Sequence, residues 1–285
     1  MKKQFIKILS TISPSMVAEI AYSTLTNPQR KKLRAHELEF LDKAQKEKIK
    51  FGEFDIQTYK WGKPEGEKIL LIHGWEGQAG NFTDIINELL KNHYYIISFD
   101  GPSHGFSSKG KTSLFEFSDL VGKMIQDNGC KKLISHSFGG VATTYALYRN
   151  KDVEIDKYIL LTTPDTFKQR IDDVGKSVGI TQKVKSKLIE KLENEIKINV
   201  SHANVSSFVK EINVKKSLII HDKNDKVIPI EQSKNVYKNW KVCSFKEIEG
   251  TGHFRILRDS SVIEAVTNFM TEKKVSSSNE RRLES

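Results

Sequence analysis

The sequence predicts an α/β protein with a mostly parallel, doubly wound sheet, a small helical cap and an extra N-terminal helical segment. Short apolar runs such as residues 68–72 and 157–161 lack polar alternation, which is typical of strands buried on both faces of a parallel sheet. Segments of helical length with one apolar face separate these runs. The chain has 285 residues, of which 38% are apolar, so it holds enough core material for one large α/β domain or two small ones.

Residues 1–48 are predicted to form a helical extension among many lysines. Asn27-Pro28 ends one expected helix and begins another. The basic start of the chain briefly resembles a signal peptide, but Lys7 interrupts its apolar stretch and Glu19 follows before any convincing cleavage site. We therefore expect an amphipathic N-terminal helix and a cytoplasmic protein.

Residues 49–272 are predicted to form the α/β domain. Its expected elements are, in order, an antiparallel hairpin at 49–61, a strand at 68–72, a helix at 81–92, a strand at 94–99, a helix at 113–127, a strand leading to Ser137 and a helix after it, a strand at 157–161, a strand at 217–220, a helix at 231–240, a strand at 241–248 and a helix at 260–271. This alternation predicts a doubly wound parallel sheet.

The alternation breaks between residues 163 and 213. Pro164 ends the preceding strand, and the lysine-rich segment that follows has helical apolar spacing interrupted by glycines. We expect a small helical cap inserted at this point. Residues 273–285 are polar and serine-rich, and we expect them to be a disordered tail.

A strand that turns sharply into a helix is expected around Ser137. Ser135 and Gly139 flank it by two residues each, and such a turn leaves room only for small side chains. The turn strains the backbone of Ser137, exposes its hydroxyl and directs the N–H of Phe138 toward an attacked carbonyl group. By itself the pattern also fits a serine that merely caps a helix.

A serine nucleophile needs a base and an acid from the same edge of the sheet. Two loops after C-terminal strands supply candidates, Asp225 and His253, and the order Ser137, Asp225, His253 is found in one family of serine enzymes. Asp222 is the alternative acid. Taken singly, Asp225 also fits a turn or helix cap, and His253 fits an ordinary histidine beside a glycine turn.

The chain resembles the α/β-hydrolase family over about residues 50–272. The motifs that carry the resemblance are His73-Gly74-Trp75, Asp100 to Ser107, Asp225-Lys226-Val227-Ile228-Pro229 and Gly252-His253. The resemblance implies that the N–H of Trp75 joins that of Phe138 in an oxyanion hole. Ser135 departs from the glycine that many members carry, but serine is small enough for the turn.

These residues predict a serine hydrolase, a carboxylesterase or thioesterase, that acts on a small-molecule ester or thioester through an acyl-enzyme on Ser137. Two alternatives remain: an acyltransferase with the same triad, and a non-catalytic ligand-binding protein of the same fold. The sequence indicates neither the acyl group nor the oligomeric state. Four other histidines are expected to be structural, with the side chain of His136 pointing away from that of Ser137; they are His73, His104, His136 and His221.

Other partners and cofactors are not expected. The net charge of +10 comes mostly from lysines spread along helix faces, without a nucleic-acid-binding motif. No run approaches the roughly 20 apolar residues of a membrane-spanning helix, so we expect no integral membrane association. Cys130 and Cys243 form no CxxC pair, and no histidines have metal-ligand spacing. We therefore expect neither a metal nor a cofactor.

Overall fold

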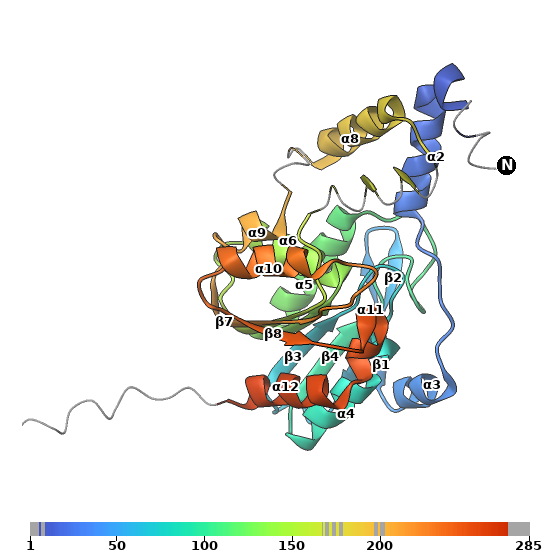
Figure 1. The fold of residues 1–285 in the computed structure, drawn as a ribbon. Coiled ribbons are helices and arrows are strands. Elements are labelled where there is room, and N and C mark those ends of the chain that lie inside the picture. The colour runs from blue at the N-terminus through green and yellow to red at the C-terminus, as the bar shows by residue number, and fades with distance from the viewer. Residues whose placement is uncertain are drawn as a thin grey trace, which may run out of the picture.

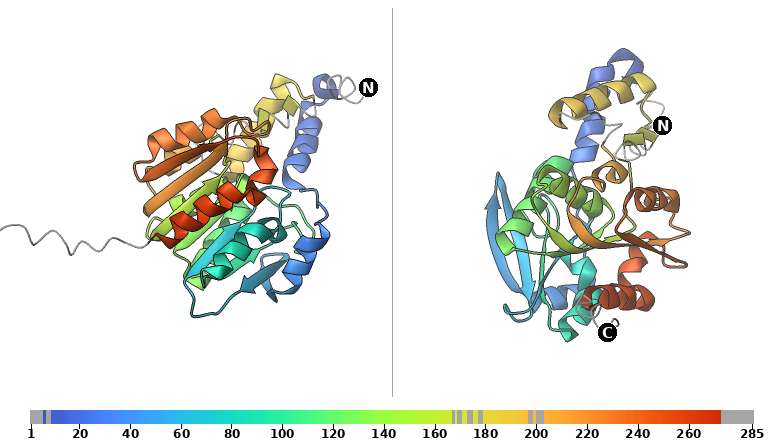
Figure 2. Two further views of the ribbon diagram at one scale, coloured as in Figure 1. Left: turned by 60° about the horizontal axis from the view of Figure 1, so that its bottom comes forward. Right: turned by 90° about the vertical axis from the view of Figure 1, so that its left-hand side faces the viewer.

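An eight-stranded, mostly parallel sheet forms the centre of the protein, with helices on both faces (Figures 1 and 2). The computed structural model describes residues 6, 9–166, 168, 171–172, 175–176, 179–196, 199 and 203–272. The predicted disordered tail, residues 273–285, lies outside the described residues. The fold class predicted from the sequence is confirmed.

The strands follow the order β1-β2-β4-β3-β5-β6-β7-β8 across the sheet. They are β1 Gln45–Phe51, β2 Phe54–Trp61, β3 Lys68–Ile72, β4 Tyr95–Phe99, β5 Lys132–His136, β6 Ile155–Leu161, β7 Val214–Asp222 and β8 Cys243–Ile248. β2 is antiparallel to both β1 and β4, and every other neighbouring pair is parallel. All residues of β4 and β5 are buried, including the polar residues Ser98, Lys132, Ser135 and His136, as expected for strands in the interior of a parallel sheet.

The first strand begins earlier than predicted. β1 starts at Gln45, inside the segment expected to be helical, and its first four residues are polar and exposed. An edge strand with polar residues on both faces has no apolar alternation to reveal it. Its pairing with β2 therefore decides its structure.

Two groups of helices cover the two faces of the sheet. α5, α6, α9 and α10 contribute to the apolar core on one face, and α3, α4 and α12 contribute to the core on the other. The helices are α2 Pro14–Thr26, α3 Ala35–Asp42, η1 Ala79–Phe82, α4 Thr83–Lys91, α5 Leu114–Asn128, α6 Phe138–Arg149, α8 Gln182–Ile196, α9 Val205–Phe208, α10 Ile230–Asn239, α11 Gly252–Arg255, η2 Ile256–Arg258 and α12 Ser260–Thr271. Among the described residues, no helix is long and apolar enough to cross a membrane.

The N-terminal helix α2 packs against α8, which belongs to the segment predicted as a cap. Val17 and Ala18 of α2 and Val184 of α8 form a small apolar cluster, and Lys191 forms an ion pair with Glu19. Figure 1 shows the two helices side by side at one end of the molecule. Within the described part of residues 163–213, the only β-structure is an isolated bridge between Thr166 and Asn204.

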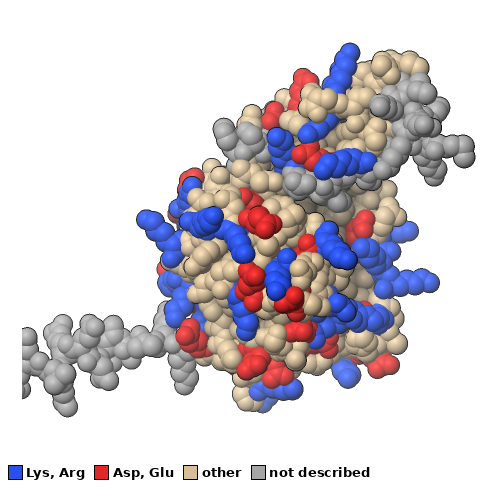
Figure 3. Space-filling model, in the orientation of Figure 1, with Lys and Arg blue, Asp and Glu red and all other residues tan. Residues whose placement is uncertain are grey.

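The surface charges are mixed on the face that Figure 3 displays, where basic and acidic side chains alternate over the body of the protein. Exposed ion pairs occur in the protein, such as that between Lys223 and Glu249. Pairs of this kind contribute little to stability because water and salt screen them. The positive net charge is thus spread over this face and does not form a single patch.

Candidate active site

Ser137 occupies a strained turn between β5 and α6. Its φ of 54° and ψ of −126° lie in a region that residues other than glycine rarely adopt. Two backbone hydrogen bonds hold the turn: the Ser137 N–H donates to Leu161 O, and the Gly140 N–H donates to Ser137 O. The surrounding sheet therefore fixes a conformation that the serine would not adopt on its own.

The residues that flank Ser137 have no space for large side chains. A Cβ atom at Gly139 would lie 2.5 Å from the carbonyl oxygen of His73 and 2.6 Å from that of Ile72. Ser135 is fully buried, and its Oγ lies 2.9 Å from the hydroxyl oxygen of Tyr158, within hydrogen-bonding distance. The turn thus accepts serine at this position, because the hydroxyl of Tyr158 is a hydrogen-bonding partner for its side chain.

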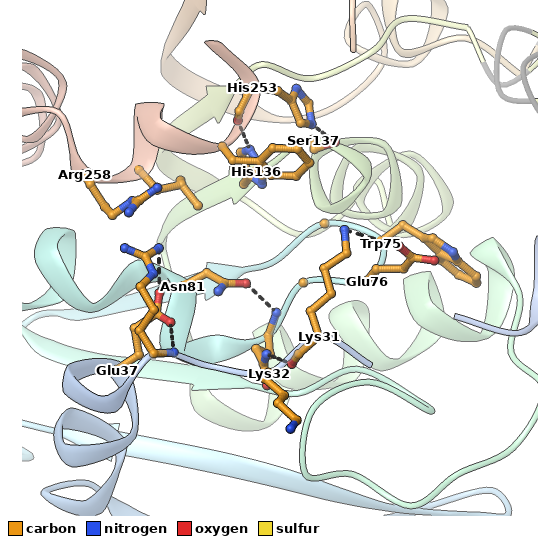
Figure 4. Close-up of a pocket in the computed structure, with 16 residues that line it drawn as sticks. Lys31, Lys32, Glu37, Trp75, Glu76, Asn81, His136, Ser137, His253 and Arg258 are labelled. Atoms are coloured by element: carbon orange, nitrogen blue, oxygen red, sulfur yellow. Dashed lines mark hydrogen bonds and ion pairs between the residues drawn. The ribbon is translucent and has the colours of Figure 1, made fainter. Parts of the chain in front are cut away.

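Three side chains from distant parts of the chain meet at this turn. Nε2 of His253 lies 3.0 Å from Oγ of Ser137, and Nδ1 of His253 lies 2.8 Å from Oδ2 of Asp225. Asp225 follows β7, and His253 lies in α11 after β8, so all three residues lie at the carboxyl edge of the sheet (Figure 4 shows Ser137 and His253). The structure therefore brings together the three residues that the sequence selected, at hydrogen-bonding distances.

The two candidate acids make different contacts. Burial would raise the pKa of Asp225, but hydrogen bonds from His253 and from the N–H groups of Val227 and Ile228 outweigh it and lower that pKa. Asp222 instead accepts hydrogen bonds from the N–H groups of Thr251 and Gly252. Asp225 therefore orients the imidazole, and Asp222 shapes the loop that carries it.

Two backbone N–H groups are available next to Ser137. In the described part of the chain, no acceptor pairs with the N–H of Trp75 or with that of Phe138. Phe138 is the first residue of α6, where amides lack intrahelical partners. The loop that carries Trp75 passes close to the serine, because a Cβ atom at Gly74 would lie 3.0 Å from Cβ of Ser137. These donors fit the oxyanion hole expected from the sequence.

Three of the other histidines hold loops through backbone contacts, as expected. His73 accepts a hydrogen bond from the Gly101 N–H, and His104 and His221 donate to the carbonyl oxygens of Pro102 and Ile228. A carbonyl oxygen only accepts, so these contacts fix which ring nitrogen carries the proton. Burial lowers the pKa of all three, that of His104 to about 4.

His136 lies nearer to the site than the sequence indicated. Its side chain was expected to point away from that of Ser137, and the residue lines the same cavity as Ser137 (Figure 4). Its ring centroid lies 5.0 Å from that of His253, and its Nε2 donates to the backbone oxygen of His253 at 2.9 Å. The prediction considered only the local turn, and the contact comes from α11, 116 residues after Ser137 in the chain.

Comparison with known proteins now identifies the fold. Residues 68–195 match a family model of the α/β hydrolase fold. The strand order, the strained serine turn and the order of the three side chains agree with it. The chain is an α/β-hydrolase-fold protein.

Named relatives cover only part of the α/β-hydrolase-fold chain. The human serine hydrolase-like protein is 30% identical over 115 residues, which are 38% of this chain and 56% of that protein. A putative esterase/lipase of Mycoplasma pneumoniae is 29% identical over 102 residues, 35% of this chain and 37% of that protein. The chain thus matches 37% to 56% of these relatives' lengths. The solved structure of an esterase from Pyrococcus furiosus has 18% identity and a TM-score of 0.61, and the match covers 86% of this chain and 96% of that one.

A cavity of about 240 Å³ lies beside Ser137 and His253. Lys31, Lys32 and Arg34 line one side of it, and they belong to residues 27–34, the segment between α2 and α3, here called the N-terminal arm (Figure 4). The arm lies outside the part of the chain that resembles the family, and sequence analysis assigned it no chemistry. The feature of its sequence that could have indicated a role in the site is the basic run Arg30-Lys31-Lys32.

The N-terminal arm is fastened to the loops of the α/β-hydrolase fold. Arg30 donates hydrogen bonds to the backbone oxygens of Ser103 and Ser107. The backbone oxygen of Lys31 accepts from the side-chain amide of Gln78 at 2.7 Å. These contacts give the arm a defined position over the cavity.

The structure also bears on metals and thiols. Among the described residues, no group of three or more His, Cys, Asp or Glu side chains could hold a metal ion. Burial raises the pKa of Cys130 to about 12 and that of Cys243 to about 11, so neither thiol is ionised at neutral pH. The absence of a cofactor stays a prediction.

Proposed function

We propose that the protein is a serine hydrolase that cleaves a carboxylic ester or thioester of a small molecule through an acyl-enzyme on Ser137. The observation that carries this proposal is the continuous contact from Ser137 through His253 to Asp225. A hydroxyl group is a weak nucleophile at neutral pH and needs such an arrangement to react. The names of the human and mycoplasma relatives, a serine hydrolase-like protein and a putative esterase/lipase, support the same class.

In the acylation step, Oγ of Ser137 attacks the carbonyl carbon and its proton moves to Nε2 of His253. Asp225 stabilises the imidazolium that forms, and the N–H groups of Trp75 and Phe138 bind the oxyanion. When the tetrahedral intermediate collapses, the bond to the leaving alcohol or thiol breaks, and His253 returns the proton to that group.

Deacylation repeats these steps with water. His253 takes a proton from the water molecule as the water oxygen attacks the acyl carbon. The acyl–Ser137 bond then breaks, and the proton returns to Oγ of Ser137. The product is a carboxylic acid, and the enzyme is restored.

A panel of esters and thioesters of graded acyl length tests the proposal, with release of acid followed for the wild type and for Ser137→Ala. We expect turnover of at least one class of substrate and a loss in kcat on the order of 10⁶ in the variant. A residual rate within tenfold of the wild type would remove Ser137 from the mechanism.

The two alternative functions, an acyltransferase and a non-catalytic binding protein, predict different results with the same substrates. An acyltransferase would form a new ester when alcohols are added as competing acceptors, at the expense of hydrolysis. A non-catalytic binding protein would turn over no member of the panel. Cytoplasmic location, a small-molecule substrate, and the absence of nucleic-acid partners and of integral membrane association remain predictions from the sequence.

A further inference from the structure

The cavity beside Ser137 is richer in basic than in acidic side chains. Its lining includes four basic residues and two acidic ones: Lys31, Lys32, Arg34, Arg258, Glu37 and Glu76. The basic residues come from both sides, three from the N-terminal arm and one from η2. A small enclosed site with an excess of positive charge attracts anionic ligands.

Both acidic side chains already have basic partners. Glu37 is buried and forms an ion pair with Arg34 at 3.2 Å, and it also accepts a hydrogen bond from the Arg34 N–H. Glu76 pairs with the ammonium of Lys31 at 3.3 Å and accepts from the N–H of Gln29. The excess positive charge therefore resides on Lys32 and Arg258.

Arg258 is the informative residue of the two. Its side chain is half-buried, yet no acidic group in the described part of the chain lies within ion-pair distance of its guanidinium. The neighbouring carboxylate of Asp259 is used to cap α12 through the N–H groups of Ser261 and Val262. A partly buried charge without a partner costs free energy, so an anionic ligand would remove a penalty that the free protein carries.

The position of Arg258 ties it to the proposed chemistry. It lies five residues after His253, at the end of η2, which directly follows the short helix α11 that carries His253. In Figure 4, Lys31 and Arg258 approach the cavity from different sides, with Ser137 and His253 above them. A substrate whose ester lies at Ser137 would place its remaining part among these cations.

We propose that the cavity binds esters or thioesters that carry a carboxylate or phosphate group, and that Arg258 is the main contact of that anion. A guanidinium binds such oxyanions with two parallel hydrogen bonds, which fixes their orientation. The inference rests on the proposed function only in placing the reacting carbonyl at Ser137. The anion belongs either to the acyl part or to the alcohol part of the substrate.

Two matched pairs of esters test the proposal and distinguish these sources. Methyl hydrogen succinate differs from methyl butyrate by a carboxylate on the acyl part, and 3-acetoxypropanoate differs from propyl acetate by a carboxylate on the alcohol part. We expect kcat/KM for the anionic member of at least one pair to exceed that of the neutral member by about 10- to 100-fold. The pair that shows this preference identifies the side of the ester that faces Arg258.

Variants assign the preference to the cavity. Arg258→Gln should reduce the anionic-to-neutral ratio of kcat/KM at least tenfold, and Arg258→Lys should retain part of it. Arg149→Gln is the matched control, because Arg149 pairs with Asp119 at the surface and lies outside the cavity lining, so the ratio should not change. If Arg258→Gln fails to fold, Arg258→Lys and a salt series on the wild type decide, since Arg258→Lys should lower the ratio in part and added salt should lower it further.

Binding to Ser137→Ala separates this proposal from the proposed function. Calorimetry with that variant should give a dissociation constant for the preferred anionic ester at least tenfold below that of its neutral partner, and Arg258→Gln in the same background should abolish the difference. This result together with no turnover by the wild type would support the anion site and refute the hydrolase. Turnover of both members with equal kcat/KM in both pairs would support the hydrolase and overturn the anion site.

Discussion

The backbone oxygen of His253 accepts a hydrogen bond from Nε2 of His136, the residue that precedes Ser137. Burial and the neighbouring His253 lower the pKa of His136 to about 3, so its ring is neutral and carries its proton on Nε2. Strand β5 thus positions both residues of the contact between Ser137 and His253. Ser137 directly follows the strand, and His136, its last residue, binds the backbone of His253.

Replacing His136 should therefore impair the position of His253. We expect His136→Ala to lower kcat about 10- to 100-fold with little change in KM, because small displacements of a catalytic base are costly. His136→Gln should restore part of kcat, since its amide can donate to the same carbonyl oxygen. Steady-state kinetics measure both, with His93→Ala on the exposed turn after α4 as control. Equal kcat in all three proteins would contradict this role.

Removing the negative charge of Asp225 should strongly lower kcat, because this carboxylate orients His253. In Asp225→Asn, the side-chain NH2 group can take the place of Oδ2 and donate to Nδ1 of His253, which favours the wrong tautomer of the imidazole, and we expect kcat to fall by about 10⁴. Asp222→Asn should act differently, because Asp222 contacts the loop and not the imidazole. Its main effect should be on stability. A larger loss of kcat in Asp222→Asn would reverse the assignment of the acid.

Asp225 also makes folding stability depend on pH. Its pKa is lower in the folded protein than its ordinary value of about 3.9, so its ionised form stabilises the fold above that pH. This contribution is lost as the pH falls through the folded-state pKa. The difference in unfolding free energy between wild type and Asp225→Asn, measured by urea denaturation, should therefore shrink as the pH falls below about 4. A difference that grows below that pH would contradict this direction.

The serine turn should not tolerate a single added methyl group. In Gly139→Ala the new Cβ would meet two backbone oxygens, which cannot move aside as a side chain can. We expect a loss of about 1–3 kcal/mol in the unfolding free energy and reduced activity. Gly122→Ala, in the interior of α5, is the control: no atom lies closer than 3.6 Å to its added Cβ, and it should stabilise by about 0.5–1 kcal/mol. Similar unfolding curves for both variants would refute the steric argument.

The N-terminal arm should depend on Arg30. In Arg30→Gln the hydrogen bonds to Ser103 and Ser107 are lost, and we expect KM to rise about tenfold, while kcat changes little because Arg30 lies outside the serine turn. Limited digestion with trypsin gives an independent readout, since Lys31 and Lys32 should be cut faster in the variant. If both KM and the rate of tryptic cleavage were unchanged, the hydrogen bonds of Arg30 would not be needed to hold the N-terminal arm in place.

Contacts that follow from the topology of the sheet could be predicted from the sequence, and contacts that depend on the angle between packed segments could not. Ser137, Asp225 and His253 each follow a strand of a parallel sheet, so topology alone brings them to one edge. The contact of His136 with His253 depends on the angle at which α11 approaches β5, which no local pattern encodes. The polar strand β1 and the N-terminal arm have no periodic apolar pattern that would predict their structure. In both segments the structure depends on contacts with other parts of the chain.

The cavity illustrates the same limit. The excess of positive charge around Arg258 exists because the arm, residues 27–34, folds over a loop more than two hundred residues away in the chain. Sequence analysis placed the lysines of this protein on solvated helix faces, which holds for many of them, but could not single out those that line the cavity.

The most direct test of the account is covalent labelling of Ser137 by a fluorophosphonate, followed by mass spectrometry of the digested protein. The reagent reacts with a serine only when a base activates it and donors stabilise the developing charge. We predict one adduct on the peptide that contains Ser137, formed rapidly in the wild type and lost in His253→Ala. An unmodified Ser137 in the folded wild-type protein, or equal labelling in His253→Ala, would contradict the central claim.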